Sequence, residues 1–274
     1  MNFKVARVGL HHWEEPVISG ERGSGTVFFS GCYLRCVYCQ NYAISHKAQG
    51  LFISQEQLIK LMLYLQDKGA HNINLVTPSH YITKLPKMLK EAKQNGLEIP
   101  IGYNTSSYES VENLKSLEGL VDVYLPDLKY YDNALGQRYS KVKDYFDVAS
   151  KAIIEMRRQC PKDVIKDELI KSGVIVRHLV LPSHIDDTKK VLDFLADFDK
   201  TLFISLMSQY FPTCNVKTFP EINRRITQAE YDEVIEYFFE VGLKNGFCQE
   251  LTSAIEDYVP DFDLGELQKI VDEL

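Results

Sequence analysis

The sequence predicts an α/β fold, a partial (β/α)6 barrel of TIM type in which parallel strands alternate with helices. Two observations favour it: six short β-branched or aromatic runs alternate with amphipathic helical runs, and no linker or repeat divides the 274 residues. Such an alternation requires a parallel sheet with right-handed crossovers. We therefore expect a single domain over residues 1–274, with an N-terminal loop over 1–21, a core over 22–210 and C-terminal helices over 211–274. A doubly wound sheet is the alternative.

The expected strands are short runs rich in residue types that suit a pleated sheet. They cover residues 26–30, 73–77, 99–103, 121–125, 174–181 and 202–207. Helices are expected between them over 57–67, 83–94, 109–117, 146–158 and 187–198, and again after Thr227 and over 264–273. Ser54 with Gln57, and Thr227 with Glu230, form the pattern that caps a helix start, and Gly96 suits a helix end.

The composition excludes several classes of protein. With 45% apolar and 25% charged residues, the chain is neither disordered nor collagen-like. The net charge is −7 and the pI is near 5.6, so nucleic acid is not an expected partner. No apolar run approaches the ~20 residues that cross a bilayer, and the first residues lack the apolar part of a signal peptide. We expect a cytoplasmic protein without a membrane partner.

Polar side chains follow every expected strand, at the edge of the sheet where the active sites of such folds lie. The first strand is followed by Gly31 and a cysteine cluster. The others are followed by Thr77-Pro78-Ser79-His80, Asn104-Thr105-Ser106, Asp127-Leu128-Lys129, Ser183-His184 and Ser208-Gln209-Tyr210. Polar loops are ordinary at strand ends, but six of them together with clustered thiols predict a site.

The cysteine cluster has the spacing C-x-x-x-C-x-x-C, with Cys32, Cys36 and Cys39 in one short loop. In a reducing compartment, clustered thiols indicate a metal or catalysis rather than a disulfide. Thiolates select zinc or an iron–sulfur cluster. A zinc site needs a fourth ligand, and the nearest candidate, His46, lacks a second partner at finger spacing. An iron–sulfur cubane held by three cysteines leaves one iron open to a small molecule.

The stretch from Gly31 to Asn41, with an aromatic residue before its third cysteine, resembles the signature of the radical S-adenosylmethionine (radical SAM) superfamily. The resemblance implies that the three cysteines hold a [4Fe-4S] cluster whose open iron chelates the amino and carboxylate groups of SAM. Reductive cleavage of SAM would then give methionine and a 5′-deoxyadenosyl radical that abstracts hydrogen. The backbone of Tyr38 would hydrogen-bond the adenine.

Residues 22–210 are more closely similar to the group of pyruvate formate-lyase activating enzymes. Asp127-Leu128-Lys129 resembles the D-x-K motif of that group. There the lysine meets the SAM carboxylate, and the aspartate helps to bind a monovalent cation. Asn104-Thr105 stands where the group has an Asp-Thr pair that serves the cation and SAM. The asparagine removes one anionic ligand from that cation site.

Arg177 lies in an otherwise apolar strand, where a guanidinium is costly to bury without a partner. The related enzymes place an arginine there toward SAM, which implies a SAM contact; a structural salt bridge is the alternative. The neighbouring His178 should point to the opposite face and pack there.

The glycine-rich G-G-E segment that holds the SAM amino group in the superfamily is absent from this chain. In its place, Thr77 and Ser79 could supply oxygens to SAM. His80 is a candidate SAM contact or acid–base group, with an ordinary loop residue as the alternative.

Several features have no assigned role. Cys160, Cys214 and Cys248 lack partners at ligand spacing and are expected to be bystander thiols, with Cys214 the nearest to the expected site. The segment from His11 to Pro16 contains the only tryptophan, Trp13, and is expected to be a loop folded over a barrel end.

The resemblance implies an oxidoreductase that abstracts hydrogen from an unidentified substrate, with activation of a glycyl-radical enzyme as the first candidate. Its expected partners are SAM, an electron donor such as flavodoxin or ferredoxin, and a protein substrate. Two alternatives stay open. One is radical modification of a small metabolite, nucleoside or other protein; the other is an iron–sulfur or zinc protein without SAM chemistry.

Overall fold

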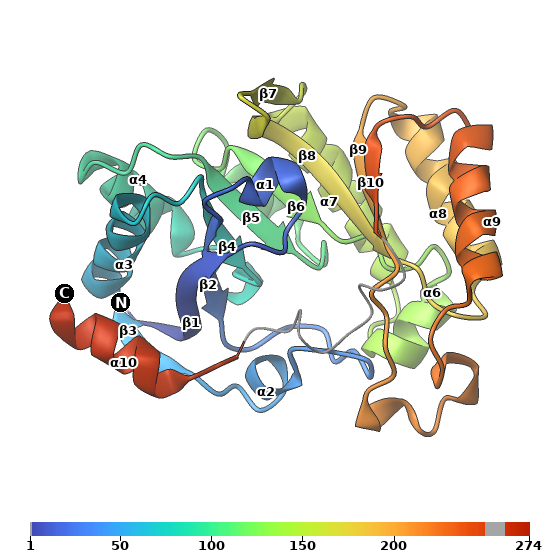
Figure 1. Cartoon of the computed structure of the whole chain (residues 1–274), viewed down its shortest axis with the longest axis horizontal. Coiled ribbons are helices and arrows are strands. Elements are labelled where there is room, and N and C mark those ends of the chain that lie inside the picture. Colours follow the sequence, from blue (N-terminus) through green and yellow to red (C-terminus); the bar gives the residue numbers. More distant parts are fainter. Residues whose placement is uncertain (1, 250–260) are drawn as a thin grey trace.

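The computed structural model describes residues 2–249 and 261–274, and its strands form one mixed sheet (Figure 1). The strands are β1 (Asn2–His11), β2 (Ser24–Phe29), β3 (Leu51–Ser54), β4 (Ile73–Val76), β5 (Ile101–Thr105), β6 (Val123–Pro126), β7 (Val164–Lys166), β8 (Leu169–Leu179), β9 (Phe203–Met207) and β10 (Gly246–Cys248). Their order is β10-β9-β8-β6-β5-β4-β2-β1-β3, and β7 pairs with β8. Neighbours in this order from β10 to β2 are parallel, whereas β1 is antiparallel to β2 and to β3, and β7 is antiparallel to β8.

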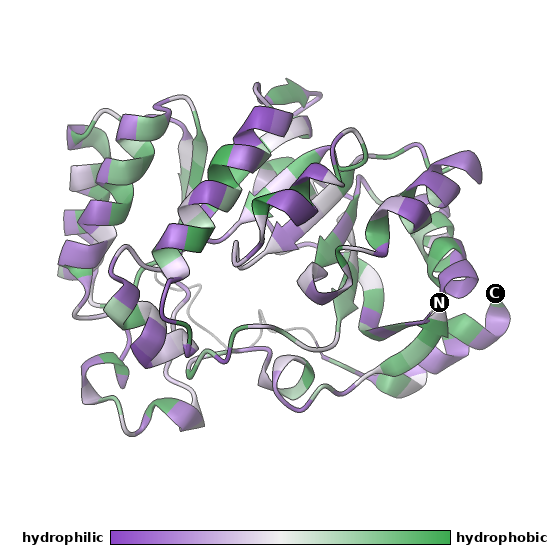
Figure 2. Ribbon diagram, turned by 180° about the vertical axis from the view of Figure 1, so that it is seen from behind, coloured by the Kyte–Doolittle hydropathy of each residue, from purple (hydrophilic) through white to green (hydrophobic). Residues whose placement is uncertain are grey.

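Helices connect the parallel strands. They are α1 (Pro16–Ser19), α2 (Tyr42–Ser45), α3 (Gln55–Asp67), η1 (Ser79–Tyr81), α4 (Leu85–Gln94), α5 (Val111–Lys115), α6 (Asn133–Leu135), the π-helix η2 (Gly136–Ser140), α7 (Tyr145–Gln159), α8 (Ile185–Phe198), η3 (Cys214–Val216), η4 (Pro220–Ile222), α9 (Gln228–Glu240) and α10 (Leu264–Glu273). Hydrophilic and hydrophobic residues alternate around the longer helices (Figure 2). This is the pattern of helices that bury one face against a sheet.

The six predicted strands are present as β2, β4, β5, β6, β8 and β9, so the predicted alternation is confirmed. Both predicted capping boxes are formed: the side chain of Ser54 accepts a hydrogen bond from the backbone of Gln57, and that of Thr227 accepts one from Glu230. Gly96 follows α4 with a φ of +96°, a left-handed conformation that glycine adopts without strain. That the whole chain forms one domain stays a prediction.

Two expectations about the ends of the chain are wrong. Residues 2–11 form the strand β1 rather than a loop. A bulge between Val5 and Arg7 shifts the register of β1 against β2, which breaks the period-two pattern that marks a strand. The region expected to hold only helices contains β10, whose three residues are too few for a sequence signal.

Helix α1 packs against strands β6 and β8. Ile18 of α1 packs there with Val123, Leu125 and Ile175, in an apolar cluster separate from the main core between sheet and helices. Asn72, just before β4, donates a hydrogen bond of 2.7 Å to the carbonyl of Ile18. The predicted site lies at the carboxyl-terminal ends of the strands, where the cysteine loop follows β2.

Candidate active site

The cysteine loop follows β2 and is held by backbone hydrogen bonds. The backbone N–H of Gly31, whose φ is +98°, donates a hydrogen bond of 2.8 Å to the carbonyl of Ile44. In the π-helix η2, the carbonyl of Ser140 accepts a hydrogen bond of 3.1 Å from the backbone N–H of Arg35. The carbonyl of Tyr139 accepts one of 2.8 Å from the backbone N–H of Val37. The loop is thus held in place by hydrogen bonds to α2 and to η2.

Two of the three thiols have hydroxyl partners. Cys36 Sγ lies 3.0 Å from Ser140 Oγ, and Cys39 Sγ lies 3.1 Å from Ser45 Oγ. Burial raises the pKa of Cys32 to about 11 and that of Cys36 to about 12, and it also raises the pKa of Cys39. The ammonium of Lys129 acts in the opposite direction on all three thiols, which places it within electrostatic reach of each.

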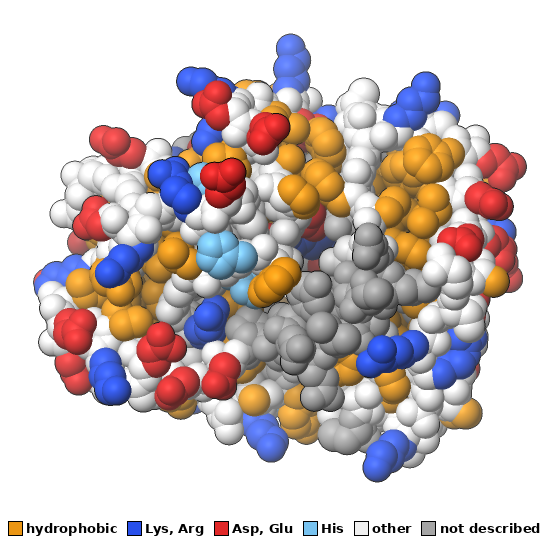
Figure 3. Space-filling model, in the orientation of Figure 1, with side chains coloured by type: hydrophobic (Ala, Val, Ile, Leu, Met, Phe, Trp, Pro, Cys, Tyr) orange, Lys and Arg blue, Asp and Glu red, His pale blue; other side chains and the backbone are white. Residues whose placement is uncertain are grey.

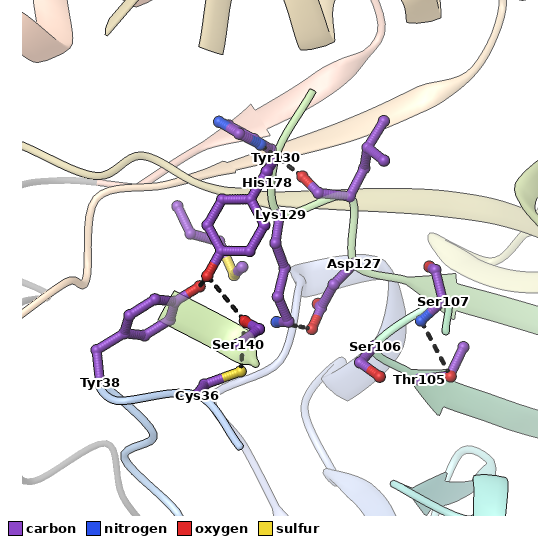
Figure 4. A network of polar contacts seen from close by, with 12 residues as sticks. Cys36, Tyr38, Thr105, Ser106, Ser107, Asp127, Lys129, Tyr130, Ser140 and His178 are labelled. Atoms are coloured by element: carbon purple, nitrogen blue, oxygen red, sulfur yellow. Dashed lines mark hydrogen bonds and ion pairs between the residues drawn. The ribbon is translucent and has the colours of Figure 1, made fainter. Parts of the chain in front are cut away.

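A chain of hydroxyls extends from the cysteine loop into the core (Figure 4). The hydroxyls of Tyr38 and Tyr130 are 2.5 Å apart, and Tyr130 lies 2.9 Å from the Ser140 hydroxyl that contacts Cys36. Burial raises the pKa of both tyrosines, so their hydroxyls are neutral. Sequence reasoning missed Tyr130 and Ser140, because their contacts with the loop span about a hundred residues and leave no local pattern.

Lys129 and Asp127 point toward one another beside Cys36 (Figure 4), with 2.5 Å between Lys129 Nζ and Asp127 Oδ2. Burial alone would lower the pKa of Lys129, but the Asp127 carboxylate and its other neighbours raise it well above its usual value. The backbone N–H of Lys129 donates 3.0 Å to the hydroxyl of Tyr145. The D-x-K motif therefore presents a permanently charged ammonium at the end of β6.

Asn104 and Thr105 serve different surroundings, since consecutive strand residues point to opposite faces. The hydroxyl of Thr105 donates 2.7 Å to Glu109 Oε1, which also accepts 2.9 Å from the hydroxyl of Tyr103. Ser79 lies 3.4 Å from Thr105 in the same buried cluster. Burial raises the pKa of Glu109, which has only hydroxyl partners. SAM contacts by Ser79, Asn104 and Thr105 stay predictions.

The loop after β4 stands in the place of the superfamily's glycine-rich segment. Thr77 has a φ of +56°, a strained conformation for a β-branched residue, and its backbone N–H donates 2.9 Å to the carbonyl of Asn104. His80 packs with its ring centroid 4.2 Å from that of Tyr81, and burial lowers the pKa of His80. The loop brings both residues to the same end of the barrel as the cysteines, and their roles stay predictions.

Arg177 takes part in an ion-pair layer whose two glutamates the sequence did not identify. Its guanidinium donates from Nε and Nη2 to both carboxylate oxygens of Glu15, at 2.9 and 2.5 Å, and from Nη2 to Glu14 Oε2 at 2.5 Å. Burial would lower the pKa of Arg177, but the two carboxylates raise it. Arg177 thus forms the structural salt bridge that was the alternative; contact with SAM stays a prediction.

The expected loop from His11 to Pro16 connects β1 to α1 and carries both glutamates of this layer into the barrel. His178 lies on the other face, with Nδ1 2.6 Å from the carbonyl of Leu128 and Nε2 2.9 Å from Thr188 Oγ1, and it packs there as expected. Of the remaining cysteines, Cys160 is buried and Cys248 exposed, both as free thiols. The side chain of Cys214 lies outside the described residues.

The donor set fits an iron–sulfur cluster. Within residues 2–249 and 261–274, no three His, Cys, Asp or Glu side chains converge on a single-ion site. A cubane does not require such convergence, because each cysteine ligates a different iron. Three soft sulfur ligands from one fixed loop, with hydroxyls beside two of them, suit a cluster whose fourth iron stays open.

The family model of the radical SAM superfamily matches residues 26–195. The chain belongs to the radical SAM superfamily. Membership implies a [4Fe-4S] cluster and SAM as cofactors, and it identifies the chain as an enzyme. In the described part of this radical SAM protein, no helix is long and apolar enough to span a membrane.

This radical SAM protein is 35% identical over 237 residues to an uncharacterized protein of Methanocaldococcus jannaschii, covering 83% of this chain and 64% of the length of that relative. It is 29% identical over 190 residues to the pyruvate formate-lyase-activating enzyme of Clostridium pasteurianum, covering 64% of this chain and 69% of that enzyme. Among solved structures, the FeFe-hydrogenase maturase HydG from Carboxydothermus hydrogenoformans matches with a TM-score of 0.51 at 14% identity, covering 89% of this chain and 63% of that one. The latter likeness concerns the fold alone.

Proposed function

We propose that the protein is an oxidoreductase that cleaves SAM reductively and directs the resulting 5′-deoxyadenosyl radical at a substrate inside the barrel. The observation that supports this most is the position of the Lys129 ammonium, paired with Asp127, beside Cys36 of the cysteine loop (Figure 4). The cysteine loop suits a cluster and the ammonium suits an anionic group of SAM.

The residues divide the work by their chemistry. The three cysteines would hold the cluster, which when bound supplies the electron that splits SAM into methionine and the radical. Lys129, kept charged by Asp127, would pair with the SAM carboxylate. The hydroxyls of Ser140 and Ser45 would donate to cysteine sulfurs and stabilise negative charge there. Asp127 and the amide oxygen of Asn104 would be the ligands of a monovalent cation.

Activation of a glycyl-radical enzyme is the first candidate reaction, supported by the likeness to the activating enzyme of Clostridium pasteurianum. Its partners would be a protein substrate and an electron donor such as flavodoxin or ferredoxin, in the cytoplasm. Modification of a smaller substrate is the second candidate, favoured by a cavity of about 390 Å³ beside Arg177, a size that suits a small molecule.

The test is release of 5′-deoxyadenosine by anaerobically reconstituted protein given SAM and a reductant. We expect Cys36→Ala to lose the cluster's visible absorbance and all cleavage, while Cys160→Ala, which removes a buried thiol outside the loop, keeps both. SAM should also change the electron spin resonance spectrum of the reduced cluster. Full cleavage by Cys36→Ala, or a spectrum insensitive to SAM, would contradict the proposal.

A further inference from the structure

The ion-pair layer formed by Glu14, Glu15 and Arg177 holds one more carboxylate than cations. Both carboxylate oxygens of Glu15 accept hydrogen bonds from Arg177, one from Nε and one from Nη2. Glu14 accepts only from Nη2, which it shares with Glu15. Arg177 is the only cation in an ion pair with either glutamate among the described residues. The other charged groups near Arg177 do not restore the balance, because Asp127 is paired with Lys129 and burial lowers the pKa of His11.

Unused hydrogen-bond acceptors accompany the surplus carboxylate. Asn74 is fully buried, and its Nδ2 donates 2.9 Å to Glu14 Oε1. Because a carboxylate only accepts, this contact fixes the orientation of the amide, and the buried Oδ1 of Asn74 has no hydrogen-bond partner. Gln249 Oε1 is likewise buried and without a partner. Buried acceptors are normally satisfied, so the partnerless oxygen of Gln249 indicates a missing donor. The contact from Asn74 holds the Glu14 carboxylate in place.

Glu14 and Gln249 line the same cavity. It has a volume of about 390 Å³ and lies between the segment before α1 and the ends of β8, β9 and β10. Its other walls include the apolar side chains of Trp13, Met207 and Phe247. Figure 3 shows a hollow at the upper centre of this face, with hydrophobic side chains on both sides of it. The cavity thus combines an apolar wall with an acceptor-rich, negatively charged end.

We propose that this cavity binds a protonated amine carried by the substrate, with Glu14 as the charged partner and the amide oxygen of Gln249 as a further acceptor. An ammonium offers three donors and one positive charge, which matches both deficits. A carboxylate or phosphate on the substrate would be repelled by Glu14. The inference deepens the proposed function and rests on it, because strands β8 and β9, through Arg177 and Ser205, form part of the cavity wall.

The only tryptophan of the chain, Trp13, lies in the cavity wall and provides a readout that needs no turnover. In anaerobically reconstituted protein, we expect n-butylammonium to shift the Trp13 fluorescence and the neutral n-butanol not to do so. N-acetyl-lysine methylamide tests whether an amine on a peptide side chain is accepted. A response to it as strong as that to n-butylammonium assigns the amine to a peptide, and a much weaker one assigns it to a small molecule.

Variants locate the amine. Glu14→Gln keeps the shape of the side chain and should weaken n-butylammonium binding by about tenfold, the size of a charge-assisted hydrogen bond. The matched control is Glu21→Gln, which changes an exposed carboxylate outside this cavity and should bind as the natural protein does. If Glu14→Gln does not fold, Gln249→Met tests the same site at the edge of the sheet, and a weaker response to n-butylammonium is again expected.

Three results would overturn the inference. They are equal responses to n-butylammonium and n-butanol, unchanged amine binding by Glu14→Gln, and loss of SAM rather than amine binding in that variant, which would make the SAM amino group the partner of Glu14. These outcomes are separate from failure of the proposed function. A protein that releases 5′-deoxyadenosine but ignores amines keeps that function and loses only the amine site.

Discussion

The cysteine loop and the ion-pair layer are both buried and polar, but they are built from opposite materials. The hydrogen-bond partner of the Cys36 thiol is the neutral hydroxyl of Ser140. That hydroxyl contacts the hydroxyl of Tyr130, which in turn contacts that of Tyr38. In the layer, the partners are ions, and Arg177 pairs with the carboxylates of both Glu14 and Glu15. Removing a neutral partner lowers the free energy of unfolding by the contribution of one hydrogen bond. Removing an ion costs more, because it leaves its partner as an unpaired charge in the protein interior. The two regions should therefore tolerate substitution very differently.

The largest expected effect is that of Arg177→Met. It leaves Glu14 and Glu15 buried without a cation, so we expect the free energy of unfolding to fall by about 3–5 kcal/mol. Urea denaturation measures it. Adding Glu14→Gln and Glu15→Gln should recover much of the loss.

The matched control is Lys189→Met, which breaks the exposed pair with Glu233 and should cost less than about 1 kcal/mol. Equal losses in the two methionine variants would show that the layer is no more demanding than a surface ion pair.

A smaller effect is expected at the neutral end, from Ser140→Ala. The substitution removes one hydroxyl that contacts both Cys36 and Tyr130, and we expect a loss of about 1–2 kcal/mol in urea denaturation. With fewer hydrogen bonds to sulfur, the reduction potential of the reconstituted cluster should become more negative. Ser116→Ala, at an exposed helix end, is the control and should leave the potential unchanged.

The smallest effect is expected for Glu109→Gln, which tests a buried carboxyl that has hydroxyls but no cation. Burial raises the pKa of Glu109, so the folded protein binds its proton more tightly than the unfolded chain. Its contribution to stability is therefore full below the unfolded pKa and is lost as the pH rises through the folded pKa.

Urea denaturation at pH 5 and pH 8 measures this dependence. The natural protein should lose more stability than Glu109→Gln over that interval. Equal slopes in the two proteins would show that Glu109 titrates normally and that its hydroxyl partners compensate fully for burial.

Most of the parallel sheet could be predicted from the sequence, because its elements are specified by patterns of neighbouring residues. The boxes at Ser54 and Thr227 and the spacing of Cys32, Cys36 and Cys39 each lie within a few residues, so one stretch of chain contains the whole signal. The strand β1 was not predicted because its bulge interrupts the alternation of buried and exposed residues. The strand β10 was not predicted because it has only three residues.

The site was predictable up to the same limit. The cysteine loop and Lys129 could be found from motifs, but the partners of Arg177 lie more than 160 residues away. The sequence indicated that Arg177 needs a partner and could not say which one. Glu109 was missed for a related reason. A glutamate at the start of an expected helix is ordinary in sequence, and only the fold shows that it is buried and accepts hydrogen bonds from Tyr103 and Thr105.

The backbone contacts between the cysteine loop and the π-helix η2 predict the order in which the protein folds and receives its cluster. Small zinc domains often fold only when the metal arrives, because nothing else holds their ligands together. Here Arg35 and Val37 are tied to η2 and Gly31 to α2 by the polypeptide itself. The protein should therefore fold first and receive its cluster afterwards, so that oxygen damage to the cluster would leave a native scaffold ready to be loaded again.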